Sequence, residues 1–97
     1  MSNKEFAELL DYITEKTNEL ENVTVYRVHS SYDPSNNKFT KISLKINYTK
    51  DGSELPVILN GKLPKNVVER SVNFRSSECN KENIIEWLDE FIDEKRK

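Results

Sequence analysis

In the stretch Lys38–Tyr48, KFTKISLKINY, polar and apolar side chains alternate, without a break from Lys41 to Tyr48. Alternation with period two and β-branched residues is typical of a strand with one face on a hydrophobic core and the other in water. Its inward set is Ile42, Leu44, Ile46 and Tyr48, and its outward set is Lys41, Ser43, Lys45 and Asn47. The remainder of the chain must therefore cover one face of this strand, and the face left in water is basic.

Two amphipathic helices are predicted to supply that cover. The first lies at about 3–20, where Ser2 and Glu5 fit a capping box and apolar residues recur behind them at helical spacing. The second begins near Cys79, with Ser77 or Asn80 as its N-cap. Its apolar stripe is Ile84, Ile85, Trp87, Leu88, Phe91 and Ile92.

Residues 23–29 are β-branched and aromatic, which predicts another strand. Its facing is ambiguous, because Val23 and Val25 favour one side and Tyr26 and Val28 the other. A β-bulge or an edge position would reconcile the two sets.

Further strands are predicted at Leu55–Leu59 and Val67–Arg75, separated by turn signals. Pro56 cannot donate to a β-ladder, so the first of these should lie at an edge or a strand start. Arg70 falls on the apolar side of the second, where its stem can pack while its head reaches water. The polar stretch 31–37 is predicted to be a loop.

These elements predict one α+β domain over residues 1–97, in the order α-β-β-β-β-α. Short connections favour an antiparallel four-stranded meander. Because only one sheet face is apolar, both helices should pack on that face and form a two-layer sandwich.

The α-β-β-β-α portion of this order resembles that of double-stranded-RNA-binding domains. The resemblance covers element order only. The loop motif and the basic helix start of that family are absent, and the last helix here is acidic where theirs is basic. The function of the family is therefore not carried over.

Charge is segregated along the chain although the net charge is only −2. Residues 1–21 carry two basic and six acidic residues, and residues 78–97 carry four basic and seven acidic ones. The middle, residues 22–77, carries nine basic and four acidic residues. Acidic ends that flank a basic middle indicate charged surfaces suited to steering a partner.

Catalytic and metal chemistry find little support in the residues. His29 is the only histidine and has no recognisable partner, and Cys79 is the only cysteine, so together they cannot build a zinc site in a monomer. Cys79 lies near a predicted helix N-terminus, which lowers a thiol pKa, but no Cys–His motif surrounds it. The two glycines both lie in turns, which excludes a phosphate-cradling loop. We expect no enzyme, no catalytic residues, no cofactor and no metal.

Cellular location is predicted from what the chain lacks. A single cysteine excludes an internal disulfide, and we expect neither a signal peptide nor a membrane span. The expected location is the cytoplasm, or the cytoplasm of a host cell. The Lys-, Asn- and Glu-rich composition is similar to that of accessory proteins of AT-rich bacteria and their phages.

The predicted function is non-enzymatic binding by protein–protein contact, as an inhibitor, an immunity-type protein or an adaptor. The partner could present a basic surface to the acidic helices. The alternative is a nucleic-acid-binding module that uses the basic open sheet face, although Phe39 is the only aromatic residue expected there for base stacking. Self-association, to a homo-oligomer, is open to both hypotheses. Candidate partner-binding residues are Glu86, Asp89, Glu90, Asp93, Tyr32, Lys41, Lys45 and Arg75.

Overall fold

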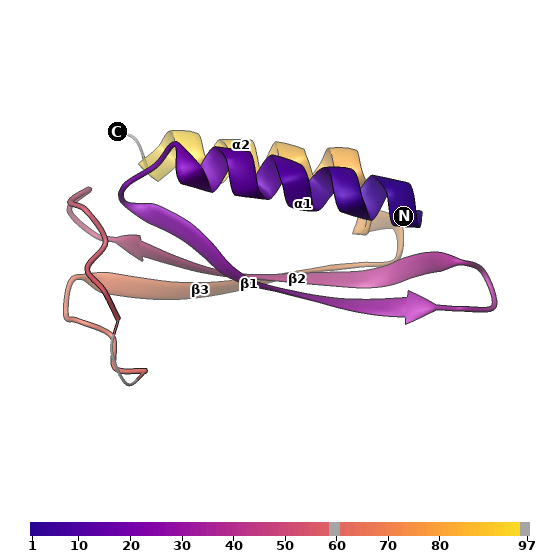
Figure 1. Cartoon of the computed structure of the whole chain (residues 1–97), viewed down its shortest axis with the longest axis horizontal. Helices are drawn as coiled ribbons and strands as arrows, with labels where there is room; N and C mark the ends of the chain where they lie inside the picture. Colours follow the sequence, from indigo (N-terminus) through magenta and orange to yellow (C-terminus); the bar gives the residue numbers. More distant parts are fainter. Residues whose placement is uncertain (59–60, 96–97) are drawn as a thin grey trace.

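The computed structural model describes residues 1–58 and 61–95. Its strands form one antiparallel sheet in the order β1-β2-β3, and both helices lie on the same face of that sheet (Figure 1). The architecture is therefore a two-layer α+β sandwich. In chain order its elements are α1 (Asn3–Asn18), β1 (Val23–Asp33), β2 (Lys38–Thr49), β3 (Val67–Arg75), the short 3-10 helix η1 (Ser76–Glu78) and α2 (Lys81–Lys95).

The predicted four-stranded meander is wrong, because the sheet formed by residues 1–58 and 61–95 has three strands. β2 pairs directly with β3, so no place remains between them for a strand at Leu55–Leu59. The described part of that segment, residues 55–58, has no regular secondary structure, and Leu59 lies outside the described residues. This apolar run does not form a strand, because Pro56 removes a donor and the edge of β2 with which it would pair is already taken by β3.

Helix boundaries follow from local capping. In α1 the Ser2 hydroxyl accepts from the Glu5 amide and the Glu5 carboxylate accepts from the Ser2 amide, so the predicted capping box is confirmed. At α2 the Asn80 side chain accepts from the Asn83 amide at 2.8 Å, which identifies Asn80 as the N-cap. The end predicted at residue 20 is two residues too long, since α1 stops at Asn18.

β1 contains the irregularity that its sequence indicated. Its register with β2 shifts between Val25 and Arg27, which makes Tyr26 the extra residue of a β-bulge. Val23, Val25 and Val28 can then all face the helices, while Tyr26 turns to the open side. The strand also continues through Asp33, so the loop predicted from residue 31 is shorter and the turn spans only 34–37.

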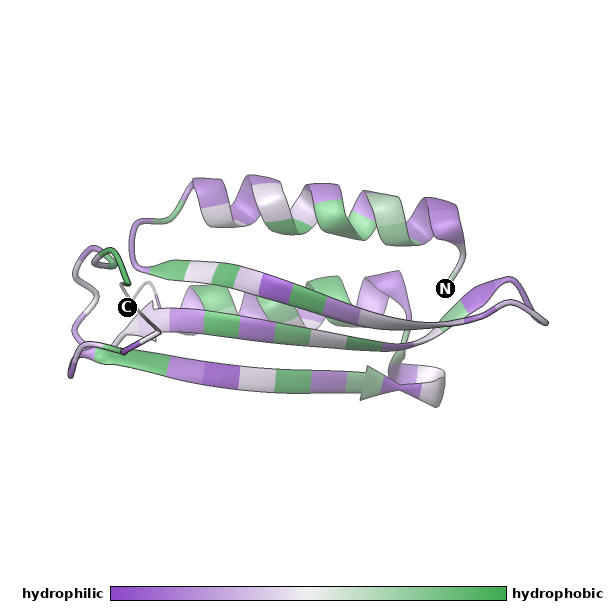
Figure 2. Ribbon diagram, turned by 60° about the horizontal axis from the view of Figure 1, so that its bottom comes forward, coloured by the Kyte–Doolittle hydropathy of each residue, from purple (hydrophilic) through white to green (hydrophobic). Residues whose placement is uncertain are grey.

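The hydrophobic core lies between the sheet and the two helices. Figure 2 shows the alternation of apolar and polar residues along the strands that makes this one-sided core. On β2 the predicted inward residues Ile42, Leu44 and Ile46 are fully buried. They pack with α1 and α2 in a cluster completed by Leu9, Ile13, Val23, Phe74, Cys79, Ile84, Leu88, Phe91 and Ile92.

Arg70 behaves as expected for a long cation at the edge of an apolar face. It is exposed, and its guanidinium carbon lies 5.3 Å from the ring centre of Trp87 and 5.5 Å from that of Phe91. Trp87 in turn packs edge-on against Phe74. The arginine thus covers the aromatic rim of the core by cation–π contact while its head stays in water.

Candidate functional site

Acidic side chains from both helices gather on one surface, which we call the outer helix face. The core residues of α1 and α2 point to the sheet, so the acids on the opposite arc of each helix point to solvent. The helices lie side by side, joined by an ion pair between Lys81 Nζ and Glu8 Oε2 at 3.0 Å. The exposed acids of this face are Glu8, Asp11, Glu15, Glu82, Glu86, Glu90, Asp93 and Glu94.

Asp89 differs from the other candidate acids of α2. It is half-buried, and its carboxylate accepts a hydrogen bond from the Tyr12 hydroxyl of α1. Burial, followed by this bond, raises the pKa of Tyr12 to about 12. Asp89 therefore joins the two helices, and of the predicted binding acids Glu86, Glu90 and Asp93 are the freely exposed ones.

The middle of the open sheet face is a polar hollow of about 450 Å³, which we call the basic basin. The register places His29, Ser43 and Asn73 in one row across the three strands, and the Ser43 hydroxyl is hydrogen-bonded to Asn73. Lys41 and Lys45 lie on either side of that row. None of the described residues that line the basin is acidic: they are His29, Ser30, Ser31, Lys41, Ser43, Lys45, Ser71 and Asn73.

The aromatic residue of the open face is a different one from that predicted. Phe39 stacks on Phe6 of α1 with ring centres 4.2 Å apart, so it belongs to the helix side. Tyr26, turned outward by the bulge, lies on the open face and donates to Glu69 Oε1 at 2.7 Å. This bond is the main reason that the Tyr26 pKa is raised. Base stacking on Phe39 is therefore excluded as a role for the open face.

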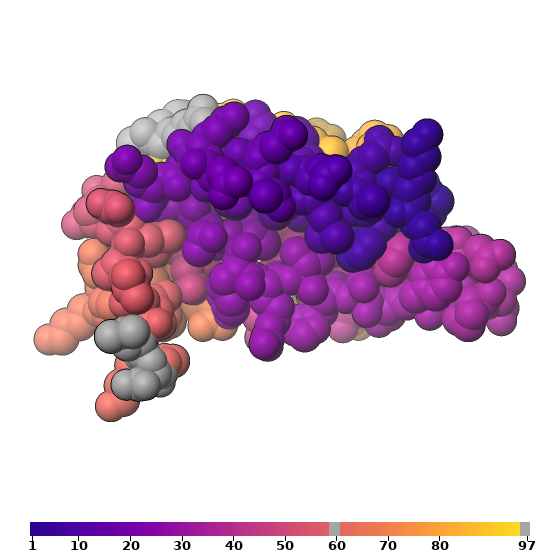
Figure 3. All heavy atoms as spheres, viewed as in Figure 1, coloured from indigo at the N-terminus to yellow at the C-terminus, as the bar shows by residue number. Residues whose placement is uncertain are grey.

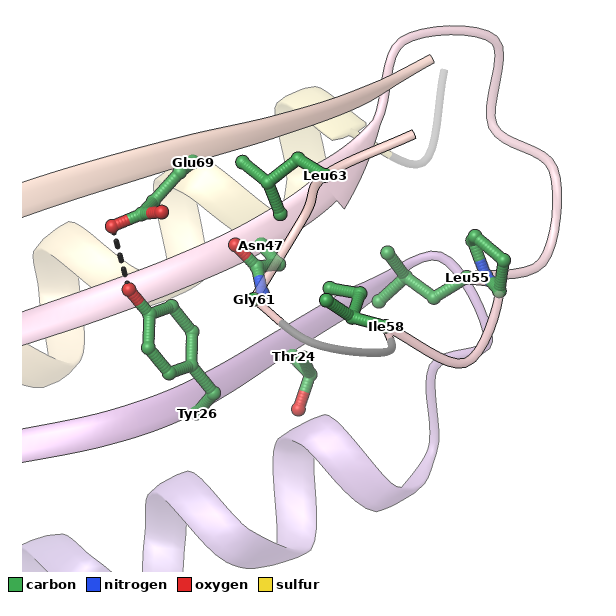
Figure 4. A pocket seen from close by; sticks show the side chains of 9 residues that line it. Thr24, Tyr26, Asn47, Leu55, Ile58, Gly61, Leu63 and Glu69 are labelled. Carbon is green, nitrogen blue, oxygen red and sulfur yellow. Dashed lines mark hydrogen bonds between the residues drawn. The ribbon is translucent and has the colours of Figure 1, made fainter. Parts of the chain in front are cut away.

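One end of the open face is covered by the connection between β2 and β3. This connection protrudes from the sheet side opposite the helices (Figures 1 and 3). Between it and the sheet lies a hollow of about 440 Å³, which we call the loop pocket (Figure 4). It is lined by Thr24, Tyr26, Asn47, Leu55, Pro56, Ile58, Gly61, Leu63 and Glu69.

The remaining candidates stand apart from one another. Tyr32 is exposed near the β1–β2 turn and contacts Phe39, with ring centres 5.0 Å apart. Arg75 is exposed at the end of β3, opposite Lys41 in the sheet register. The acidic candidates thus share the helix side, Lys41, Lys45 and Arg75 share the open side, and Tyr32 lies at the far end of the hairpin.

The two residues considered for chemistry are also separate. His29 is exposed on the open face. Cys79 is buried, and burial raises the pKa of its thiol, so the lowering expected from a helix N-terminus is wrong. Within residues 1–58 and 61–95, no group of three or more His, Cys, Asp or Glu residues is arranged to hold a metal ion.

The loop pocket was not anticipated from the sequence. Its signal was the presence of Leu55, Ile58 and Leu63 in a segment interrupted by proline and glycine, of which the sequence predicts only residues 55–59 as a strand. In the described part of the chain, neither helix is long and apolar enough to cross a membrane. The chain matches no protein-family model, no curated protein and no solved structure.

Proposed function

We propose that this protein is a non-enzymatic binding protein that acts inside the cell by protein–protein contact, with its outer helix face against a basic partner surface. The observation that carries this proposal is the lack of compensation on that face. Among the described residues, only Glu8 and Glu94 of its eight exposed acids pair with a basic group, Lys81 and Lys95 respectively.

Uncompensated charge on a rigid layer has a physical consequence. Like charges held side by side repel one another, and a partner of opposite sign relieves that repulsion on binding. The same field steers the encounter and raises the association rate, most strongly at low salt. Inhibitors, immunity-type proteins and adaptors that cover a basic groove, including a nucleic-acid-binding groove on another protein, fit this chemistry.

The test compares charge reversals that leave the fold intact. Glu86→Lys combined with Asp93→Lys changes two exposed acids of the outer helix face. Asp89 is left unchanged because it accepts the Tyr12 hydrogen bond. Glu54→Lys combined with Glu78→Lys is the matched control, since it makes the same change in net charge at exposed acids outside that face.

Each variant is used to capture proteins from nuclease-treated native lysate, and bound proteins are quantified by mass spectrometry. We expect a stoichiometric protein partner with the unmodified chain and with the control, and its loss with the helix variant. A partner retained by the helix variant, or lost equally by the control, would contradict the proposal. Sedimentation of the purified chain separates this result from self-association.

A second candidate is nucleic-acid binding through the basic basin. It is favoured by one observation: Lys41, Lys45 and His29 surround a hollow whose lining holds no acid. Phosphate contacts of this kind make log affinity fall with log salt, by a slope of about −0.9 per phosphate contacted on duplex DNA. Lys41→Glu combined with Lys45→Glu should then abolish oligonucleotide binding. Oligonucleotide binding that persists in this double variant would exclude the basin.

A further inference from the structure

The loop pocket combines an apolar wall with a polar floor. Leu55, Pro56, Ile58 and Leu63 of the β2–β3 connection form the wall, and Asn47 rises from β2 to form the floor (Figure 4). Apolar surface is also concentrated around it. Of the four large hydrophobic residues that are exposed in the described chain, Tyr26 and Leu63 line the pocket and Val57 lies between two lining residues. Concentrated exposed apolar surface marks a binding region rather than ordinary surface.

Asn47 has a buried hydrogen-bond acceptor without a partner. Only 6% of the surface of Asn47 is exposed. Within residues 1–58 and 61–95, its Oδ1 is the one buried side-chain nitrogen or oxygen atom that has no hydrogen-bond partner. A buried acceptor left in this state is unfavourable, and native structures hold few of them. A ligand that supplies a donor at this point would therefore gain a bond that the folded chain does not make.

The other polar groups of the pocket specify the charge of that donor. Asn47 lies in one row with Thr24 and Glu69, so the Glu69 carboxylate is beside it on the neighbouring strand. The Tyr26 hydroxyl donates a hydrogen bond to that carboxylate and closes one side of the pocket. Among residues 1–58 and 61–95, no lysine, arginine or histidine lines the pocket. The floor thus offers acceptors and one negative charge, which suits an ammonium group and repels an anion.

The wall is attached mainly at its ends. The Leu55 amide donates to Glu21 O at 2.8 Å, and the Lys50 amide donates to Asn66 O at 2.9 Å. In the described residues between these ends, 56–58 and 61–63, no backbone hydrogen bond holds the wall to the sheet. Asn47 Oδ1 is itself covered. A ligand donor reaches it when the side-chain amide of Asn47, which lines the pocket, turns its oxygen towards the pocket.

We infer that the loop pocket binds a small amine with an aromatic or branched aliphatic body, its ammonium group donating to Asn47 Oδ1 and lying beside Glu69. The volume of about 440 Å³ is within the range of small-molecule sites, and the walls supply the apolar contact such a body needs. This site is on the opposite side of the sheet from the outer helix face, so it is independent of the proposed protein contact.

Three probes that share one body test the assignment by amide-resolved NMR titration of the whole chain. Phenethylamine carries an ammonium, 2-phenylethanol a neutral hydroxyl and 3-phenylpropanoate a carboxylate. We expect saturable shifts at Thr24, Asn47 and Leu63 with the amine, at roughly 0.1–10 mM as for other fragments of this size. The alcohol should bind more weakly and the acid weakest.

Asn47→Leu tests the role of the acceptor. Leucine is similar in size and removes the unpaired oxygen, so the Tm should equal or exceed that of the unmodified chain. Amine binding should weaken by roughly tenfold, the effect of one charge-assisted hydrogen bond. Asn73→Leu is the control, since it makes the same change on the open face outside the loop pocket and should leave amine binding unchanged.

Several results would overturn the inference. These are an absence of saturable shifts at the pocket residues, equal affinity for amine and acid, or amine binding unaffected by Asn47→Leu. Glu69→Gln should remove the preference for the amine over the alcohol, and a preserved preference would be equally damaging. Nα-acetyllysine methylamide presents the same ammonium as a protein side chain does. Binding of that probe and not of phenethylamine would overturn the assignment to a free small molecule.

Discussion

Leu44 and Lys45 are consecutive residues of β2 that point to opposite faces of the same sheet. Leu44 is fully buried beneath the helices, whereas Lys45 lines a polar hollow that no helix covers. On the covered face, size and apolarity determine which side chain is accepted, because every neighbour is close-packed. On the open face packing imposes little, so charge, an outward tyrosine and a covering loop can all be accommodated there.

The largest expected effect tests this contrast within β2. Leu44→Asp places a carboxylate in the core without a partner, and we expect a loss of about 4 kcal/mol or more in unfolding free energy. Lys45→Asp changes a residue of the basic basin and should stay within about 0.5 kcal/mol. Urea denaturation of both variants measures the difference. Equal losses would show that the two faces are not distinguished in this way.

A second test carries the contrast to the helix layer. Leu88 of α2 is fully buried, and Leu88→Ala should cost about 3 kcal/mol through lost transfer energy and a residual cavity. Glu90 is exposed on the other arc of the same helix, and Glu90→Ala should be nearly neutral. Urea melts of the pair are the measurement. If Glu90→Ala were the more costly change, the orientation of α2 would be incorrect.

A smaller effect is expected at the boundary between the two environments, where Tyr12 donates to Asp89. Tyr12→Phe removes this bond between the helices and should cost about 1 kcal/mol at pH 7. Tyr32→Phe, at an exposed tyrosine, is the control and should cost less. Equal losses in the two variants would argue against a stabilising contact between the helices.

The raised pKa of Tyr12 also makes the stability of the fold depend on pH. The folded pKa of Tyr12 is raised to about 12 from its ordinary value of 10.0. Its contribution to stability is therefore fully present below about pH 10 and is lost as pH rises towards 12. Phenolate absorbance should show this late ionisation, and Tyr12→Phe should abolish it. A titration curve unchanged by the substitution would contradict the raised pKa.

Where a local pattern decides the structure, the sequence was sufficient. The capping box at Ser2 and the β3 strand at Val67–Arg75 were predicted correctly, and β2, predicted over Lys38–Tyr48, extends one residue further to Thr49. These features depend on local periodicity or on side chains three residues apart. Tertiary pairing decides the others. Leu55–Leu59 looks like a strand in isolation, and only the pairing of β2 with β3 shows that it has no place in the sheet.

The candidate surfaces divide in the same manner. The alternation on β2 predicted the lysines of the basic basin, and helical periodicity predicted the acids of the outer helix face. Helical periodicity did not predict the hydrogen bond between Asp89 and Tyr12, because these residues are 77 positions apart and meet only through the packing of the two helices. The loop pocket was missed for the same reason, since its wall and floor come from separate parts of the chain.

The bulge at Tyr26 has a consequence for how the chain can change in length. Val25 and Arg27 pair with Ile46 and Lys45, which are adjacent residues, so Tyr26 has no counterpart on β2. Deleting it would leave Val23, Val25 and Val28 in regular alternation and the core unchanged. Only the open face would lose a side chain, the one that closes one side of the loop pocket. A homologous chain with a one-residue gap at this position would therefore share the fold but lack the tyrosine that closes one side of the pocket. The presence or absence of the gap would distinguish the relatives that have lost this side from those that keep it.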